Sequence, residues 1–181
     1  MLQNIKMPEV SSAKSTTAAD RLKSCHDKIR HFSGVAVRLA HGQGDTASEI
    51  VQAADGLHRY FTVALPLHEA DENLSLHPRL RRALPAEELA GPAADAMLDQ
   101  HLAIDELVER LVPLWFLARS APEKLPEIAG EMCALSQRLN ELFDAHLKLE
   151  EETIFPAMER YLSQSDQAEM VREMQDRRQQ G

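Results

Sequence analysis

Four apolar stripes at helical spacing run along this chain of 181 residues, and each stripe is interrupted by one histidine. A helix stripe that faces a core is normally apolar, because a buried polar group costs free energy unless it is paired or bound. Four helices that make the same exception indicate a ligand shared in the core. The pattern therefore predicts an all-α, antiparallel up-down-up-down four-helix bundle around a metal centre. The four histidines are His26, His68, His101 and His146.

Two of these histidines are followed by a glutamate at the same spacing. His68 precedes Glu72 by four residues, and His146 precedes Glu150 by four residues. Positions i and i+4 lie on one face of a helix, roughly 6 Å apart along its axis. Each pair can therefore hold an imidazole nitrogen and a carboxylate oxygen against one ion, and two facing pairs can hold two ions. The alternative, a surface pair worth a few tenths of a kcal/mol, explains either pair taken separately.

The same periodicity divides the chain into three parts. We expect a flexible lead-in at 1–17, a four-helix domain at 18–162 and a short C-terminal helix that frays at 163–181. Pro66 predicts a kink just before His68, because proline removes a backbone donor. We expect the first helix at 18–41, and the second from Asp45 or Thr46 to His77-Pro78. The third is expected at 92–119 and the fourth at about 120 to 162. Residues 78–92 form the connection between the second and third helices, with a turn of helix at 86–89.

Composition restricts the class of protein. A formal net charge of −9 argues against a nucleic-acid partner, since phosphate binding needs a basic face. No stretch approaches 18 uncharged apolar residues and no signal peptide is visible, so we expect no membrane partner. Two cysteines, Cys25 and Cys133, make no disulfide framework, and the expected location is the cytoplasm.

The donor set restricts the metal. Imidazole with carboxylate suits iron, manganese or zinc, whereas copper(I) prefers sulfur ligands. Four histidines and two glutamates exceed the four ligands of one tetrahedral zinc ion and fit two ions of higher coordination number. The remaining histidines lie off the stripes, and we interpret them as surface or loop residues; they are His31, His41, His58 and His77.

The motifs in combination resemble the hemerythrin-like (HHE cation-binding) domain family over about residues 18–162. The resemblance is carried by Cys25-His26 on the first helix and by Pro66-Leu-His68-Glu-Ala-Asp-Glu72 on the second. The third helix contributes Asp99-Gln-His101, and the fourth contributes His146-Leu-Lys-Leu-Glu150 with Pro156 at its end.

The resemblance implies a centre of two iron ions with an oxo, hydroxo or water bridge, and it implies iron ahead of manganese or zinc. Glu72 and Glu150 would be the bridging carboxylates, and Glu69 and Asp105 are additional candidate ligands. The terminal imidazole ligands would be His26, His68, His101 and His146.

Two departures from the oxygen-carrying hemerythrins bear on function. The carriers have a second histidine four residues after the first on the third helix, where this chain has Asp105. They also have an aspartate five residues after the last histidine, where this chain has Glu150 at four. Losing an imidazole opens a coordination site or brings in Asp105 or Glu69 as an oxygen donor, which alters redox potential. Simple reversible oxygen carriage is therefore not the expected function.

Three hypotheses for function follow. The leading one is a non-haem di-iron protein that binds or senses dioxygen, nitric oxide or peroxide. The second is an iron-responsive binding, storage or buffering protein, and the third is a metal-independent helical interaction module. Separately from these hypotheses, a homodimer is a candidate assembly, with the C-terminal region as a candidate contact. No general base or nucleophile stands apart from the candidate ligands, so we expect no dedicated enzyme, and any turnover would be metal redox chemistry.

Overall fold

The computed structural model describes residues 17–42 and 46–180, and within these ranges the chain is helical with no strand. The predicted all-α class is confirmed. The lead-in expected at 1–17 falls almost wholly outside the described residues. None of the described helices is both long and apolar enough to cross a membrane.

The first helix, α1 (Ala18–His41), has the bounds that the sequence predicts. It begins with a capping box, in which the Thr17 side chain accepts from the Asp20 amide and the Asp20 carboxylate accepts from the Thr17 amide. It ends at Gly42, whose φ of 37° lies in the left-handed region that glycine adopts without strain.

The second helical run is longer than predicted. It consists of α2 (Ala47–Arg59), η1 (Tyr60–Ala64), α3 (Leu65–Ala70), η2 (Asp71–Leu76) and α4 (His77–Ala83), where η1 and η2 are π-helical turns. The expectation that His77-Pro78 ends this helix is wrong. Pro78 lies in the first turn of α4, directly after η2, and a proline is tolerated in a first turn because the N–H that it lacks would have no helical partner there.

The same arrangement recurs at two other prolines. Pro66 is the second residue after η1, and Pro156 is the second residue after the π-helical turn η4. Each of these prolines therefore follows a widened turn that separates two α-helical segments. Where the sequence predicts a kink, before His68, the structure has a π-helical turn ahead of Pro66 within a continuous helical run.

The remaining runs are α5 (Ala90–Ser120), then η3 (Pro122–Lys124) and α6 (Leu125–Leu149), which continues through η4 (Glu150–Ile154) into α7 (Phe155–Tyr161). The connection between α4 and α5 is shorter than expected, at residues 84–89, and the single turn of helix expected at 86–89 is a non-helical turn. α5 is continuous through Pro113.

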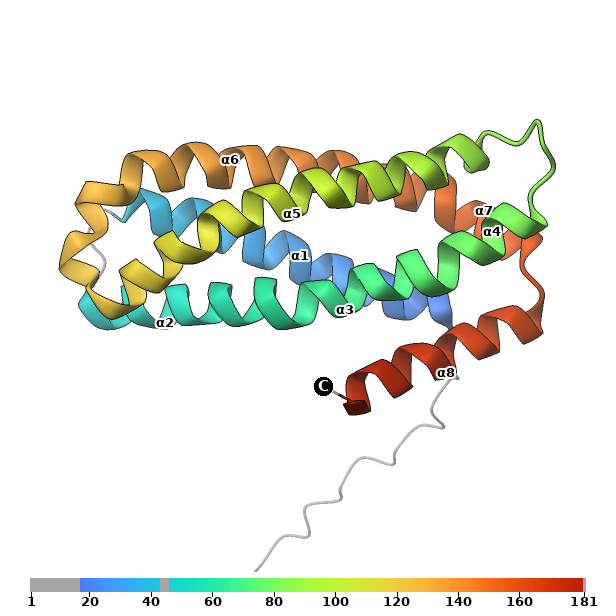
Figure 1. Ribbon diagram of the computed structural model, residues 1–181, viewed down its shortest axis with the longest axis horizontal. Coiled ribbons are helices and arrows are strands. Elements are labelled where there is room, and N and C mark those ends of the chain that lie inside the picture. The colour runs from blue at the N-terminus through green and yellow to red at the C-terminus, as the bar shows by residue number, and fades with distance from the viewer. Residues whose placement is uncertain (1–16, 43–45, 181) are drawn as a thin grey trace, which may run out of the picture.

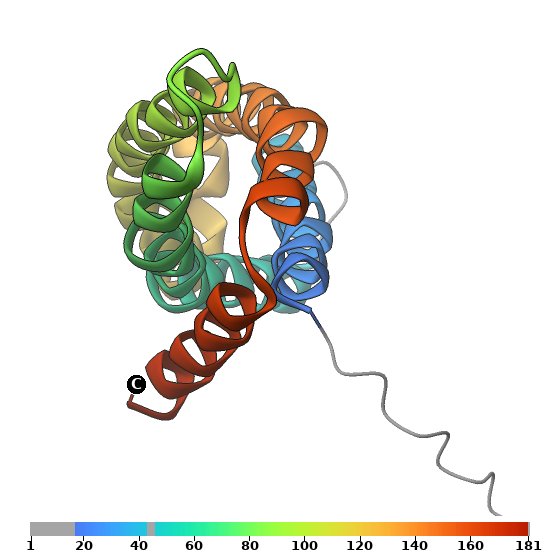
Figure 2. The same cartoon turned by 90° about the vertical axis from the view of Figure 1, so that its right-hand side faces the viewer.

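The long helical runs of the described residues lie side by side as a bundle (Figure 1). α1 packs on α2 and α6, and α5 packs on α2 and α6, so the contacts close into a ring. Figure 2, which looks along the bundle, shows this ring end-on with α8 (Gln164–Gln180) outside it. The fraying expected for the tail is not what the structure has, because Met170 and Met174 of α8 are buried against the bundle.

The apolar core is divided by a polar layer. One cluster of buried side chains includes Ile29, Ile104 and Phe143, and the other includes Leu22 and Met97. The four predicted histidines lie between these clusters along the chain and are buried. A layer of this composition inside an apolar core needs a physical explanation, because burial of polar groups is unfavourable without partners.

Candidate metal centre

The structure brings the six predicted residues together in the polar layer, from four separate helical runs. Each of these residues is no more than 3% exposed. His26 comes from α1, His101 from α5 and His146 from α6. His68 is on α3, Glu72 lies in η2 and Glu150 is the first residue of η4. Both glutamates thus belong to π-helical turns, which occur frequently at functional sites.

Each glutamate contacts two histidines from different helical runs. Glu72 Oε1 lies 3.2 Å from His68 Nε2, and Glu72 Oε2 lies 3.2 Å from His101 Nε2. Glu150 Oε1 lies 3.4 Å from His146 Nε2, and Glu150 Oε2 lies 2.9 Å from His26 Nε2. The two oxygen atoms of each carboxylate therefore face different histidines.

These contacts define two sets of four donor atoms that share both glutamates. The first set holds His26 and His68, and the second set holds His101 and His146; each set is completed by one oxygen of Glu72 and one of Glu150. Within each set the donor atoms lie within 4.8 Å of one another. Each set could hold one metal ion, and both glutamates would then contribute to both sets.

Seven of the donor atoms that face the centre have no hydrogen bond in the described part of the chain. These buried atoms are both carboxylate oxygens of Glu72 and of Glu150, together with the Nε2 atoms of His26, His68 and His101. Since a buried polar atom without a partner is costly, the donor set fits a bound cation better than it fits a closed hydrogen-bond network.

Burial also shifts the ionisation of these groups. Loss of solvation raises the pKa of Glu72 and Glu150 well above the usual carboxyl range. Loss of solvation, followed by the neighbouring imidazoles, lowers the pKa of His68 and His146 well below the usual value. The site alone therefore favours neutral groups, and positive ions between the carboxylates would supply the charge that favours their ionised form.

Three of the four imidazoles are oriented by an acceptor on their outer nitrogen. His26 Nδ1 lies 2.8 Å from Glu151 Oε1, His101 Nδ1 lies 2.8 Å from Asn73 Oδ1, and His146 Nδ1 lies 3.0 Å from Gln100 Oε1. An acceptor at Nδ1 fixes the proton there and turns Nε2 toward the centre as a donor to metal.

Sequence reasoning did not assign these three acceptors. Each is next to a predicted ligand in the chain: Asn73 follows Glu72, Glu151 follows Glu150, and Gln100 precedes His101. The sequence shows that a polar residue stands beside a predicted ligand, but it does not show which imidazole that side chain contacts. Glu151 also pairs with Arg30, at 2.8 Å, which links this end of the centre to α1.

The additional candidates Glu69 and Asp105 lie outside the two donor sets. Glu69 is buried, and its pKa is raised to about 7, first by loss of solvation and then by Asp105. The two carboxyl groups interact with each other, and the charges of both act on His101. Asp105 itself is exposed, so this carboxyl pair extends from the surface to the edge of the centre.

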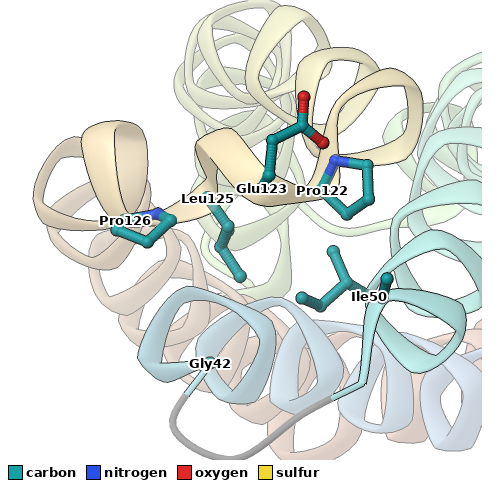
Figure 3. A pocket seen from close by; sticks show the side chains of 7 residues that line it. Gly42, Ile50, Pro122, Glu123, Leu125 and Pro126 are labelled. Carbon is teal, nitrogen blue, oxygen red and sulfur yellow. The ribbon is translucent and has the colours of Figure 1, made fainter.

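The histidines assigned to the surface do not join the centre. His31 and His41 are exposed, and His58 and His77 are half-buried. A separate hollow of about 360 Å³ lies at one end of the bundle, between the end of α1 and the start of α6 (Figure 3). Ile50 and Leu125 point into it, whereas Glu123 turns away, and it contains none of the six donor residues.

A comparison with protein families agrees with this geometry. The hemerythrin HHE cation-binding domain description matches residues 17–118. This match covers more than half of the chain and includes His26, His68, Glu72 and His101. A search of curated proteins found no match.

Proposed function

This chain belongs to the hemerythrin HHE cation-binding domain family, and we propose that it is a non-haem di-iron protein that binds or senses dioxygen, nitric oxide or peroxide. The observation that carries the proposal is the pair of donor sets that share Glu72 and Glu150. A single ion would leave half of these buried donors without a partner. Two ions use all six residues.

The proposed ligands are the six residues of the two sets. His26 and His68 would hold one ion and His101 and His146 the other, with Glu72 and Glu150 between them. Nitrogen and oxygen donors of this kind suit iron, and they exceed the ligand count of one tetrahedral zinc ion. The closed ring of helix contacts and the short connections support an antiparallel up-down-up-down four-helix arrangement as part of the same proposal.

The pair of ions, when bound, would supply redox chemistry toward a small oxidant. The chain itself contributes orientation and an apolar environment. Asn73, Gln100 and Glu151 hold three imidazoles in place, and the apolar clusters on both sides of the polar layer limit the access of water. Asp105, where the oxygen carriers have histidine, together with Glu69 places oxygen atoms at the edge of the centre, which supports a role other than simple oxygen carriage.

The test is metal analysis combined with optical spectroscopy. Protein from iron-replete cells should hold about two iron ions per chain, and reconstituted protein should change its near-ultraviolet absorption when air is admitted. Zinc or no metal under these conditions would contradict the proposal.

The same experiment separates the other hypotheses. Binding of Fe(II) that raises thermal stability without any response to oxygen, nitric oxide or peroxide would favour iron buffering. A His68→Ala, His146→Ala double variant that folds and associates unchanged, in a protein that takes up no metal, would favour a helical interaction module.

A further inference from the structure

The C-terminal helix α8 is bonded to the helical segment that carries Glu72. Asp71, Ser75 and Arg79 are spaced four residues apart on this segment, which spans η2 and the start of α4. All three side chains bond to α8, whereas the neighbouring Glu72 lies in the polar layer of the bundle. The outer face of the π-helical turn is therefore occupied by α8, and its inner face contributes a donor to the centre.

The closest attachment is at Asp71, the residue before Glu72. Asp71 is 1% exposed. Arg177 Nη1 donates to one of its oxygens at 2.8 Å, and Arg178 Nη2 donates to the other at 2.7 Å. A buried carboxylate without such partners is strongly destabilising, so the backbone at residue 71 depends on these two arginines.

Two further attachments continue along the segment. The Ser75 hydroxyl accepts from Arg177 Nη2 at 2.6 Å and donates to Glu173. Arg79 donates to Glu173 at 2.7 Å and to the backbone carbonyl of Ser75 at 3.0 Å. These bonds reach from the first residue of η2 to the first turn of α4, so α8 holds the whole widened turn.

The second glutamate has no such cover. The ion pairs that the described part of α8 makes with the bundle go to Asp71, Arg79 and Arg82, and none reaches residues 146–161. Glu150 is held instead from within the ring, where the following residue Glu151 contacts His26 and Arg30 of α1. The ion pairs of α8 in the described part of the chain are thus confined to the Glu72 side of the centre.

We propose that α8 is a positioning element for the metal centre, in which Arg177 and Arg178 fix Asp71 and so fix the π-helical turn that presents Glu72 to both ions. The proposal rests on the function proposed above. α8 also packs Met170 and Met174 into the buried apolar cluster, so its docking combines apolar contact with the ion pairs at Asp71. Release of α8 therefore loosens the centre on the Glu72 side.

The test compares an Arg177→Gln, Arg178→Gln double variant with an Arg172→Gln control. Arg172 is exposed on the same helix and makes no ion pair in the described part of the chain. The protein is loaded with Fe(II) under anaerobic conditions, and the rate of metal removal by a chelator is measured together with the infrared carboxylate bands. The double variant should release metal about tenfold faster, as is usual when residues that orient ligands are lost, and its carboxylate bands should shift.

Two further variants separate positioning from a general loss of stability. Leu135→Ala destabilises the far end of the core and should leave the carboxylate bands unchanged. Arg177→Lys with Arg178→Lys restores charge at Asp71 and should recover part of the slow release. Wild-type release and unshifted bands in the Gln double variant would overturn the proposal.

A readout in the metal-free protein keeps this test separate from that of the proposed function. Amide hydrogen exchange at residues 71–79 should be faster in the Gln double variant than in the wild type and in the Arg172→Gln control. Unchanged exchange there overturns the positioning role whether or not the wild type binds iron, whereas absence of metal from the wild type contradicts only the proposed function.

Discussion

The two segments that start at His68 and His146 are alike in sequence, and the structure gives them the same inner role. Each has a glutamate four residues after the histidine and a proline ten residues after it. Each forms a π-helical turn at the glutamate and an α-helix that begins next to the proline. Each glutamate then contacts the histidine of its own segment and a histidine of another helix.

Their surroundings differ. The residue after His68 is the buried carboxyl Glu69, whereas the residue after His146 is the buried apolar Leu147. The residue after Glu72 is an amide, Asn73, and the residue after Glu150 is a carboxylate, Glu151. The first segment is also covered by α8. The repeated sequence therefore determines which side chains face the centre. The neighbouring residues and α8 determine the charge around these side chains and the contacts that hold them in place.

The largest expected effect tests whether the two glutamates are equivalent. Glu72→Ala and Glu150→Ala should each weaken metal binding by on the order of a hundredfold or more, because each removes a donor from both sets. Isothermal titration with Fe(II) in the absence of oxygen measures this, and Glu152→Ala, at an exposed position, is the control. A variant that keeps one tightly bound ion would show that its glutamate does not bridge.

The second effect tests the difference between Glu69 and Leu147. Burial raises the pKa of Glu69 from 4.5 to about 7, so the folded state holds a proton that the unfolded state has lost. Metal-free protein should therefore lose stability as pH rises from about 4.5 to about 7, and Glu69→Gln should remove roughly 2–3 kcal/mol of that loss. Urea unfolding at pH 4.5 and pH 8 measures it, with the exposed Glu106→Gln as control. Equal pH dependence in wild type and Glu69→Gln would exclude this role.

The third effect compares the two residues that orient histidines. Glu151→Ala and Asn73→Ala should each lower metal affinity about 10- to 100-fold, with the larger loss for Glu151, because a carboxylate makes an imidazole more basic than an amide does. Competition with a chelator gives both affinities. Lys148→Ala is the control, since Lys148 is exposed within the second motif. A larger loss for Asn73 would reverse this part of the comparison.

The smallest expected effect concerns the position three residues after each glutamate. Ser75 is buried and bonds to Arg177 and Glu173, so Ser75→Ala should cost about 1 kcal/mol. Thr153 is the matching residue of the second segment and is only half-buried, so Thr153→Ala should change stability by less than about 0.5 kcal/mol. Chemical denaturation of the metal-free proteins compares the two. A cost at Thr153 equal to that at Ser75 would remove the asymmetry attributed to α8.

Much of the fold followed from local signals. Helical spacing gave the bounds of α1, and the structure shows their local causes, the capping box at Thr17 and the left-handed Gly42, which act within a few residues of the helix ends. The end of the second run was predicted wrongly at Pro78, because a π-helical turn ahead of a proline leaves no mark that sequence periodicity can detect. The packing of α8 was also missed, since a helix with few apolar residues resembles a solvated one until its ionic partners are known.

The sequence by itself determined that four helical stripes carry one histidine each and that two of them add a glutamate one turn later, because helix periodicity is a property of the local chain. It thereby specified which six side chains would meet. Only the tertiary structure decided that each carboxylate faces two histidines, that Asn73, Gln100 and Glu151 orient three imidazoles, and that α8 bonds to Asp71 behind Glu72. These contacts join residues far apart in the chain, and their geometry depends on how the helices pack and where the π-helical turns widen them.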